Sequence, residues 1–321
     1  MSGSLQAFCY RIPLRPVVMA GQTLQERSGI LLRQQIGSEI FWADAAPLPG
    51  FSDETLSDAI DDFHAGPPFQ TAALQFAQEM LAFQQMLSVN SDSPVSVSVP
   101  INALLTSDSQ NPLDSAAELA ESSYRSVKLK VGRHSLETDI DLVRTVRNHL
   151  RQDQSLRLDA NRSWTLSQAI RFGQAISDLS IEYIEEPLAD PANLETFFAE
   201  TRMPYALDET LREISCENLT ATFPRAAAFI VKPTLLGSLR PIRQWVSDGR
   251  TLVISSAFES GVGIACLAQI AQRFAPTTPC GLDTIRWIKQ DVLRNSPTVN
   301  YGSLQCDHPL SLRTDLLQEL T

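Results

Sequence analysis

The stretch "SVKLKVG", Ser126 to Gly132, alternates apolar and polar residues with the two-residue period of a β-strand. Val127, Leu129 and Val131 leave one face of this strand, and Lys128 and Lys130 leave the other. Two lysines on the same strand face usually mean that this face is exposed to solvent. The surrounding sequence decides whether that interpretation holds here.

Short apolar segments of the same kind recur from residue 95 onward, separated by segments with helical spacing. They are "VSVSVP", "SVKLKVG", "LRLDANR", "IEYIEEP", "YALDET", "AFIVKPT", "TLVISSAFE" and "PCGLDT". About eight such strands, roughly 25 residues apart, are typical of repeated β/α units that close into a parallel barrel. An open doubly wound sheet would carry a GxGxxG phosphate loop after its first strand, and none is present. We therefore expect a TIM-type (β/α)7β barrel over residues 95–300.

Helix starts between these strands are well marked. Thr165 and Gln168 in "TLSQ" have the spacing of a capping box. Asp190 precedes Pro191, which places an N-cap residue before a proline at the first helical position. Both signals support the alternation of strands and helices.

The first 94 residues have a different pattern. Three alternating segments, "LQAFCYRIPL", "GILLRQQI" and "EIFWADAAPL", predict antiparallel strands, and the region from Asp53 to Leu87 has helical spacing. We expect residues 1–94 to form a small α+β domain, completed by the C-terminal segment 301–321.

Composition limits the classes of partner. The chain has 321 residues, 43% of them hydrophobic, and a net charge of -11, which argues against nucleic acid and acidic membranes as partners. Neither a signal peptide nor a membrane-spanning stretch is recognisable, so we expect a cytoplasmic protein that acts on a small molecule. Five scattered cysteines predict reduced thiols, and the sequence makes no prediction of oligomeric state.

Polar residues follow the predicted barrel strands at their carboxyl ends. In a β/α barrel these ends meet at one face, where active sites are built, so residues far apart in sequence become neighbours. The residues are Lys128 and Lys130, Asp159 and Asn161, then Glu185, Asp208, Lys232 and Ser255.

Three carboxylates, from Asp159, Glu185 and Asp208, would repel one another in a partly dehydrated cavity unless a cation lay between them. Oxygen ligands without nearby histidine or cysteine favour a hard ion, Mg²⁺ first and Mn²⁺ second. Asn161, two residues after Asp159, could hydrogen-bond a metal-bound water. The sequence therefore predicts a divalent metal site.

Lys128, Lys130 and Lys232 would stand beside this metal. Neighbouring positive charges disfavour the protonated form of a lysine and lower its pKa towards the range of a general base. A metal and a lysine base together suggest abstraction of a proton next to a carboxylate, with the metal stabilising an ene-diolate.

Taken in order, "PLPGFSDET", "KLKVG", "LRLDANRSW", "IEEP", "LDET", "IVKPTLLGSL", "VISSAFES" and "GLDT" resemble the o-succinylbenzoate synthase family. This family lies in the muconate-lactonizing branch of the enolase superfamily, and the resemblance runs from Pro47 to Thr284. It implies an N-terminal capping domain and a lyase that dehydrates 2-succinyl-6-hydroxy-2,4-cyclohexadiene-1-carboxylate to 2-succinylbenzoate. That reaction lies on the pathway to menaquinone or phylloquinone.

The resemblance also implies roles for individual residues. Lys130 would remove the proton alpha to the ring carboxylate and then help the hydroxide to leave, with Lys128 beside it keeping its pKa low. Lys232 would stabilise the intermediate as a cation near a π system. The backbone groups of Ser255 and Gly281 would hold the succinyl carboxylate. The loop of residues 47–52 would close over the mouth of the barrel, while "FWAD" at residues 41–44 departs from the Gly-x-Gly-Glu-like run of many relatives.

Other activities remain open at this stage. An N-acylamino acid racemase, a dipeptide epimerase or a muconate cycloisomerase of the same branch could use the same lysines and metal. The single acid in "GLDT", Asp283, argues against the epimerase, in which an acidic pair would bind a substrate ammonium. A Schiff-base aldolase would leave the three carboxylates unexplained, and a binding protein would not need the full catalytic set.

Overall fold

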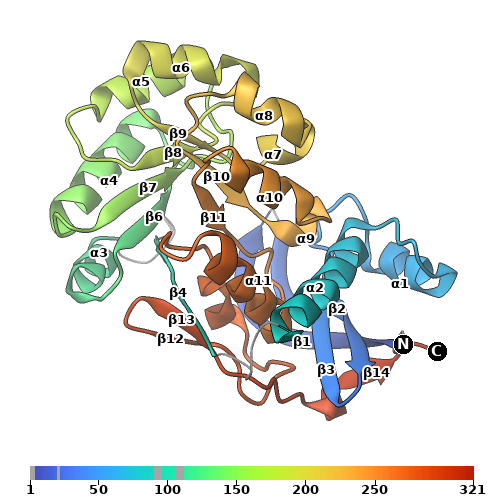
Figure 1. Ribbon diagram of the computed structural model, residues 1–321. Helices are drawn as coiled ribbons and strands as arrows, with labels where there is room; N and C mark the ends of the chain where they lie inside the picture. Colours follow the sequence, from blue (N-terminus) through green and yellow to red (C-terminus); the bar gives the residue numbers. More distant parts are fainter. Residues whose placement is uncertain (1–3, 20–21, 90–95, 106–111) are drawn as a thin grey trace.

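The computed structural model describes the whole chain except residues 1–3, 20–21, 90–95 and 106–111. Two parts are visible in Figure 1, an antiparallel sheet with two helices and a larger barrel. The predicted boundary between residues 94 and 95 lies outside the described residues.

The first part is built as the sequence predicts. Its sheet contains the long strands β1 (Leu5–Met19) and β2 (Gln22–Ile36) and the shorter β3 (Glu39–Ala45), all antiparallel. Helices α1 (Leu56–Ala65) and α2 (Ala72–Val89) follow. Strand β14 (Leu317–Glu319) near the end of the chain pairs with β1 and adds a fourth strand.

The larger part contains a seven-stranded parallel sheet whose strands run in sequence order. They are β5 (Ala103–Leu105), β6 (Ser126–Lys130), β7 (Ser155–Asp159), β8 (Tyr183–Glu185), β9 (Tyr205–Leu207), β10 (Ala228–Val231) and β11 (Leu252–Ile254). Isolated parallel bridges join Ser255 to Gly281 and Cys280 to Ile101, so the two edges of the sheet meet and the barrel closes.

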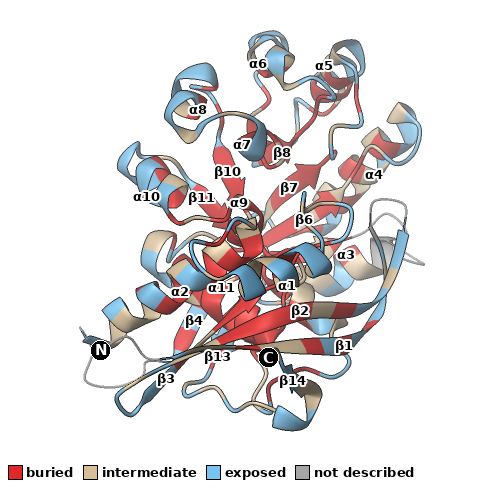
Figure 2. Cartoon of the chain, turned by 90° about the vertical axis from the view of Figure 1, so that its right-hand side faces the viewer, coloured by how far each residue is buried: buried red, intermediate tan, exposed pale blue. Residues whose placement is uncertain are grey.

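Helices connect and surround these strands (Figure 1). They are α3 (Pro112–Glu121), α4 (Leu136–His149), α5 (Leu166–Ala175), α6 (Leu194–Thr201), α7 (Thr210–Glu213), α8 (Cys216–Thr222), α9 (Pro233–Leu236), α10 (Arg240–Ser247) and α11 (Gly261–Phe274). Figure 2 shows buried strands at the centre and helices with an exposed outer face. Strands covered on both faces need apolar residues throughout, and β8, β9, β10 and β11 are buried along their whole length.

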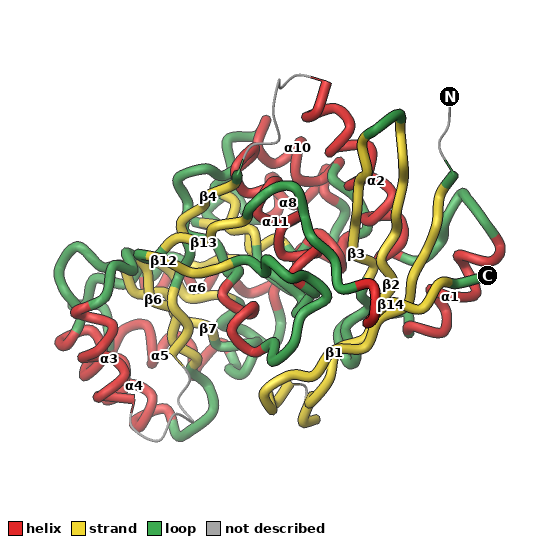
Figure 3. The backbone as a smooth tube through the Cα atoms, turned by 90° about the horizontal axis from the view of Figure 1, so that it is seen from below, coloured by secondary structure: helices red, strands yellow, loops and turns green. Residues whose placement is uncertain are grey.

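The prediction of the first barrel strand was wrong. "VSVSVP" forms β4 (Val97–Pro100), which pairs with β13 (Ser303–Cys306) in a separate antiparallel sheet, completed by β12 (Thr298–Asn300) (Figure 3). Val97 and Val99 are buried whereas Ser98 is exposed, and this alternation belongs to a sheet with one solvated face. The first barrel strand is the next segment, β5.

The last predicted strand, "PCGLDT", is reduced to the bridges made by Cys280 and Gly281. The chain then turns into the short 3-10 helix η2 (Asp283–Trp287). Two further 3-10 helices are η1 (Pro191–Asn193) and η3 (Thr314–Leu316).

The predicted helix starts are confirmed. Thr165 and Gln168 form a reciprocal capping box at the start of α5, and the Asp190 side chain accepts a hydrogen bond from the backbone of Ala192 in η1. All five cysteines are free thiols. Among the described residues, no helix combines the length and apolar character needed to cross a membrane.

Candidate active site

The register of the parallel strands places the predicted residues in one row. Lys130 at the end of β6 is level with Asp159 at the end of β7, and Asp159 is level with Glu185 at the end of β8. Asp208 follows directly after β9, and Lys232 directly after β10. Residues from five strands thus meet at the carboxyl end of the barrel.

Lysines and carboxylates form a continuous cluster there. Lys128 Nζ lies 2.7 Å from Asp159 Oδ2 and 2.8 Å from Glu185 Oε2. Lys130 Nζ lies 2.6 Å from the same Asp159 oxygen, and Lys232 forms an ion pair with Asp208. Asp159, Glu185 and Asp208 are only 1%, 1% and 6% exposed. Three of the four lysines of the chain are gathered in this cluster.

The usual interpretation of two lysines on one strand face does not apply to β6. The side chains of Lys128 and Lys130 are 16% and 20% exposed, so both lie largely within the protein. Burying a charge is unfavourable unless an opposite charge accompanies it, and the carboxylates of β7 and β8 meet this need.

Electrostatics couple these groups. Burial by itself would lower the pKa of Lys128, but the negative charges of Asp159 and Glu185 outweigh it and hold this pKa well above its usual value. Burial and the charge of Asp159 raise the pKa of Glu185 to about 8. The lowering of the lysine pKa values that we expect beside a bound metal stays a prediction. Lys232 shows the same upward direction, since Asp208 and Glu185 outweigh its burial.

The donor set fits a hard divalent cation in chemistry. It supplies three carboxylates on adjacent strand ends, and burial together with the charge of Asp159 raises the pKa of Glu185. Lysine ammonium groups lie among these carboxylates. Among the described residues, no group of three Asp, Glu, His or Cys side chains is arranged to hold a metal ion.

Asn161, Ser255 and Gly281 also lie at this end of the barrel. Asn161 Oδ1 accepts a hydrogen bond from Lys130 Nζ at 2.7 Å, so the amide orients that lysine together with Asp159. Ser255 and Gly281 are bridged partners, and Ser255 Oγ donates to the Gly281 carbonyl at 3.4 Å. A Cβ atom at residue 281 would lie 2.6 Å from Ser255 Oγ, so glycine fits this position best.

Glu186 has no predicted role in the site, yet its side chain supports the loop that follows β9. Its fully buried carboxylate accepts hydrogen bonds from the backbone N–H groups of Asp208 at 2.8 Å and Thr210 at 2.9 Å. Arg162 pairs with it at 3.1 Å. Glu186 therefore fixes the loop that presents Asp208. The sequence signal for Glu186 is the pair of adjacent acids in "EEP". The site uses only one acid from the end of β8, so the second acid needs a structural role.

The loop of residues 47–52 lies over the barrel from the capping sheet. Leu48 packs against Leu235 and Ala257, which follow β10 and β11. Asp208 and Lys232 line a small cavity of about 10 Å³, which is about the volume that one water molecule needs.

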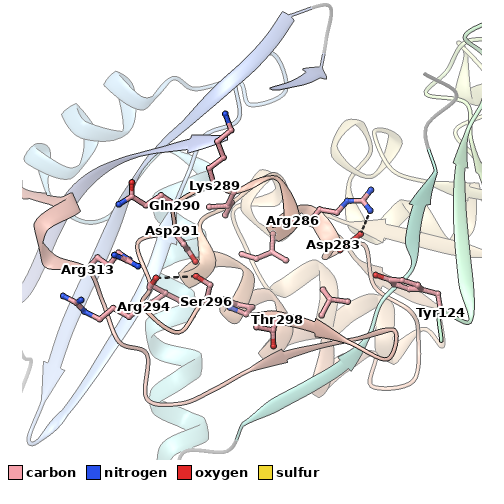
Figure 4. A pocket seen from close by; sticks show the side chains of 15 residues that line it. Tyr124, Asp283, Arg286, Lys289, Gln290, Asp291, Arg294, Ser296, Thr298 and Arg313 are labelled. Atoms are coloured by element: carbon pink, nitrogen blue, oxygen red, sulfur yellow. Dashed lines mark hydrogen bonds and ion pairs between the residues drawn. The ribbon is translucent and has the colours of Figure 1, made fainter. Parts of the chain in front are cut away.

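A second cavity lies elsewhere. It measures about 630 Å³ and is lined by the segment from Asp283 to Val299 together with Tyr124 and Arg313 (Figure 4). Asp283 in its wall forms an ion pair with Arg286 at 3.1 Å. None of the residues proposed for catalysis lines this cavity.

Comparison with known proteins agrees with the geometry. Residues 113–308 match the family model for the enolase C-terminal domain-like fold, and residues 3–89 match that of the MenC N-terminal domain. The chain is 32% identical over 320 residues to o-succinylbenzoate synthase of Yersinia pseudotuberculosis serotype O:1b (strain IP 31758), covering 95% of this chain and 94% of that one. The o-succinylbenzoate synthase of Pectobacterium atrosepticum is 31% identical over 90% of this chain and 92% of its own length.

Solved structures give the same result. The o-succinylbenzoate synthase of Thermosynechococcus elongatus BP-1, complexed with Mg in the active site, superimposes with a TM-score of 0.71 at 26% identity, covering 86% of this chain and 92% of that one. The L-Ala-D/L-Glu epimerase of Bacillus subtilis reaches a TM-score of 0.80 at 18% identity, over 97% and 98% of the two chains, and shows the shared fold.

The capped barrel and its row of lysines and carboxylates define a member of the enolase superfamily. Within that superfamily the chain belongs to the o-succinylbenzoate synthase family, and it is a metal-dependent lyase that works by dehydration.

Proposed function

We propose that this member of the family removes water from 2-succinyl-6-hydroxy-2,4-cyclohexadiene-1-carboxylate and so forms 2-succinylbenzoate, on the pathway to menaquinone or phylloquinone. The observation that carries the proposal is the placement of Lys130 and Lys232. Lys130 lies on β6 and Lys232 directly after β10, four strands further around the barrel. The three carboxylates lie on the strand ends between them. A flat ring bound over the carboxylates would have one ammonium group on each side.

Asp159, Glu185 and Asp208 would hold Mg²⁺, with Mn²⁺ as the second choice. When bound, the metal would stabilise the negative charge that develops on the substrate carboxylate as its neighbouring proton is removed. Asn161 would act next to this group, since it orients Lys130 beside Asp159. Lys128 would hold Asp159 and Glu185 in position before metal binding.

The proton moves at Lys130. Its Nζ atom, as a neutral amine, would take the proton from the ring carbon next to the carboxylate, and the resulting ammonium would return it to the departing hydroxide. One C–H bond and one C–O bond break, the ring becomes aromatic, and one water leaves. Lys130 is then again a neutral base.

Lys232 would contribute its positive charge rather than a proton. Its ion pair with Asp208 fixes the ammonium group opposite Lys130, where a cation near the face of a developing aromatic ring is favourable. The backbone at Ser255 and Gly281, whose N–H groups donate to Val231 and Ile254, would line the site of the succinyl carboxylate. The 47–52 loop would exclude water from the reacting centre.

The geometry gives no support to a dipeptide epimerase. That activity needs an acidic group free to bind a substrate ammonium, and the Asp283 carboxylate is paired with Arg286 in the wall of the separate cavity. The division into a cap of residues 1–94, a barrel of residues 95–300 and a C-terminal segment 301–321 that completes the cap belongs to this proposal, as does a cytoplasmic location. The pairing of β14 with β1 supports the last segment's assignment.

The test is to incubate the protein with the cyclohexadiene substrate and Mg²⁺ and to follow the aromatic product by its ultraviolet absorbance. We expect product that depends on added metal. N-acylamino acids, dipeptides and muconate serve as the comparison panel. Turnover of one of these, with none of the cyclohexadiene, would contradict the proposed dehydration and leave the superfamily assignment intact.

A further inference from the structure

The cavity lined by the segment from Asp283 to Val299 has no role in the proposed dehydration. Its volume of about 630 Å³ is in the range of small-molecule sites in proteins. Four basic and two acidic side chains line it, although the chain as a whole has a net charge of -11. This local surplus of positive charge favours an anion as the ligand.

The first acid of the wall, Asp283, is already neutralised. It forms an ion pair with Arg286, whose guanidinium also donates to the Leu104 carbonyl at 3.1 Å. The same guanidinium lies 4.1 Å from the centre of the Trp287 ring. Asp283 and Arg286 therefore satisfy each other and leave the remaining positive charges of the cavity uncompensated.

The second acid, Asp291, is directed to the start of helix α11. It is 6% exposed, and its Oδ1 atom accepts hydrogen bonds from the backbone N–H groups of Gly261 at 2.9 Å and Val292 at 2.7 Å. A carboxylate at this place is stabilised by the positive end of the helix dipole. Asp291 thus fixes the cavity wall to α11 and pairs with none of the arginines.

Arg294 and Arg313 lie on a short antiparallel pair of segments. Leu293 is bridged to Leu312, and the backbone N–H groups of Arg294 and Arg313 each donate across the pair at 2.7 Å. The two arginines are diagonal neighbours in this pair, so their side chains leave the same face with Cβ atoms roughly 7–8 Å apart. The backbone therefore holds the two guanidinium groups within reach of one ligand.

Neither arginine has an acidic partner. Within the described part of the chain, the side chains of Arg294 and Arg313 form no ion pair and no hydrogen bond to another residue. Figure 4 shows both guanidinium groups at one end of the cavity, opposite the pair of Asp283 and Arg286, while Lys289 points away from them. Two neighbouring positive charges repel each other unless an anion lies between them.

The remaining wall offers apolar surface from Ile288, Pro297 and Val299. A phosphate monoester carries about two negative charges on one group at neutral pH and accepts bidentate hydrogen bonds from arginine. We infer that this cavity binds a small organic phosphate monoester, with Arg294 and Arg313 holding the phosphate group and the apolar wall contacting the organic part. The site is separate from the row of lysines and carboxylates at the barrel mouth.

Calorimetric titration of the whole chain with phenyl phosphate tests this inference. EDTA is present, so that no metal ion joins the carboxylates at the barrel mouth. We expect a Kd below about 1 mM, and binding about tenfold tighter than that of inorganic phosphate, which lacks the apolar part. Phthalate carries its two charges on separate carboxylates and should bind about fivefold more weakly than phenyl phosphate.

Two variants locate the site. Arg294→Gln and Arg313→Gln should each weaken the binding of phenyl phosphate by about tenfold, because each removes one charged donor group. Arg294 is exposed, so its variant should fold normally even if the half-buried Arg313 contributes to stability. Arg243→Gln is the control, since it removes an exposed arginine of α10, a helix outside the cavity wall.

Three results would overturn the inference. Unchanged binding in both arginine variants would place the anion elsewhere, and no binding up to about 10 mM phenyl phosphate would mean that the cavity is not an anion site. Tighter binding of phthalate would make it a dicarboxylate site. None of these measurements uses the cyclohexadiene substrate, so their outcome is independent of the proposed dehydration.

Discussion

Lys128 Nζ contacts both carboxylate oxygens of Glu185, at 2.9 and 2.8 Å. Glu185 is also one of the three proposed metal ligands. Without Mg²⁺, this ammonium group is what keeps Glu185 and Asp159 from repelling each other. Lys128 and a bound metal would both neutralise the negative charge of these carboxylates.

Lys128→Met should lower the free energy of unfolding in EDTA by about 3 kcal/mol, since it leaves buried carboxylates without a counter-ion. Mg²⁺ should then stabilise the variant more than the wild type, because it restores the missing charge. Thermal unfolding with EDTA and with Mg²⁺ measures both effects. Lys289→Met, at an exposed lysine, is the control. Equal stabilisation of both proteins by Mg²⁺ would argue against a metal among these carboxylates.

Lys130→Ala should reduce kcat by about 10³-fold or more, because no other group is placed to take the proton on that side of the ring. The fold should persist, as judged by circular dichroism, since the side chain is at the rim of the cluster. Steady-state turnover is the measurement, with Lys289→Ala as the matched lysine control. Near-normal turnover would show that Lys130 is not the base.

Lys232 distinguishes charge from proton transfer. Lys232→Arg keeps a cation beside Asp208 and should retain measurable turnover, whereas Lys232→Met should lose about 10²-fold or more in kcat. A base would be lost equally in both variants, because arginine does not release its proton at neutral pH. Equal inactivity of the two would therefore favour a proton-transfer role.

Gly281→Ala should raise KM by about tenfold, because the added methyl group would press on Ser255 Oγ, 2.6 Å away, and shift the backbone groups proposed to bind the succinyl carboxylate. Ser255→Ala alone should have little effect, since its backbone is retained. The double variant should recover part of the loss. No recovery would mean that crowding against Ser255 is not the cause.

Asp44 makes stability depend on pH. It accepts hydrogen bonds from Ser260 N at 2.9 Å and Oγ at 2.7 Å, and burial raises its pKa from 3.8 to about 6. The folded chain then holds more protons than the unfolded chain between pH 4 and 6, so the contribution of Asp44 falls as pH rises through this window, by about 3 kcal/mol in all.

Asp44→Asn should remove that slope, because an amide does not titrate in this range while its oxygen can still accept from Ser260. Urea unfolding between pH 4 and 7 measures the difference between the variant and the wild type. As pH rises, the free energy of unfolding of the variant should increase relative to that of the wild type. Parallel curves would show that Asp44 does not titrate in this range.

The sequence predicted the site best at the carboxyl ends of the barrel strands, where a polar residue follows an apolar strand. The order of Lys130, Asp159 and Glu185 along the chain becomes their order around the barrel, because consecutive parallel strands are neighbours. "VSVSVP" was misassigned since its alternation suits a half-exposed strand, and its partner β13 lies about 200 residues away, where no local pattern points to it.

Arg27 of β2 could not be found in the same way. It acts by donating to the backbone carbonyls of Pro47 and Phe258, and a carbonyl has no residue type that a sequence could show. Glu186 is an intermediate case, because an acid that follows Glu185 directly needs a structural partner, but only the fold shows that this partner is the backbone at Asp208.

The chain has 26 basic residues, yet only four are lysines, and three of these stand in the cluster at the barrel mouth. The rest of the surface carries its positive charge on arginine, which ordinary acylating reagents leave alone. Primary amines are thus concentrated where the chemistry is expected, with Lys289 and the N-terminus as the exceptions. An amine-directed label would modify exposed Lys289 and the N-terminus first, and the slower labelling of the three ion-paired lysines would report separately on the mouth.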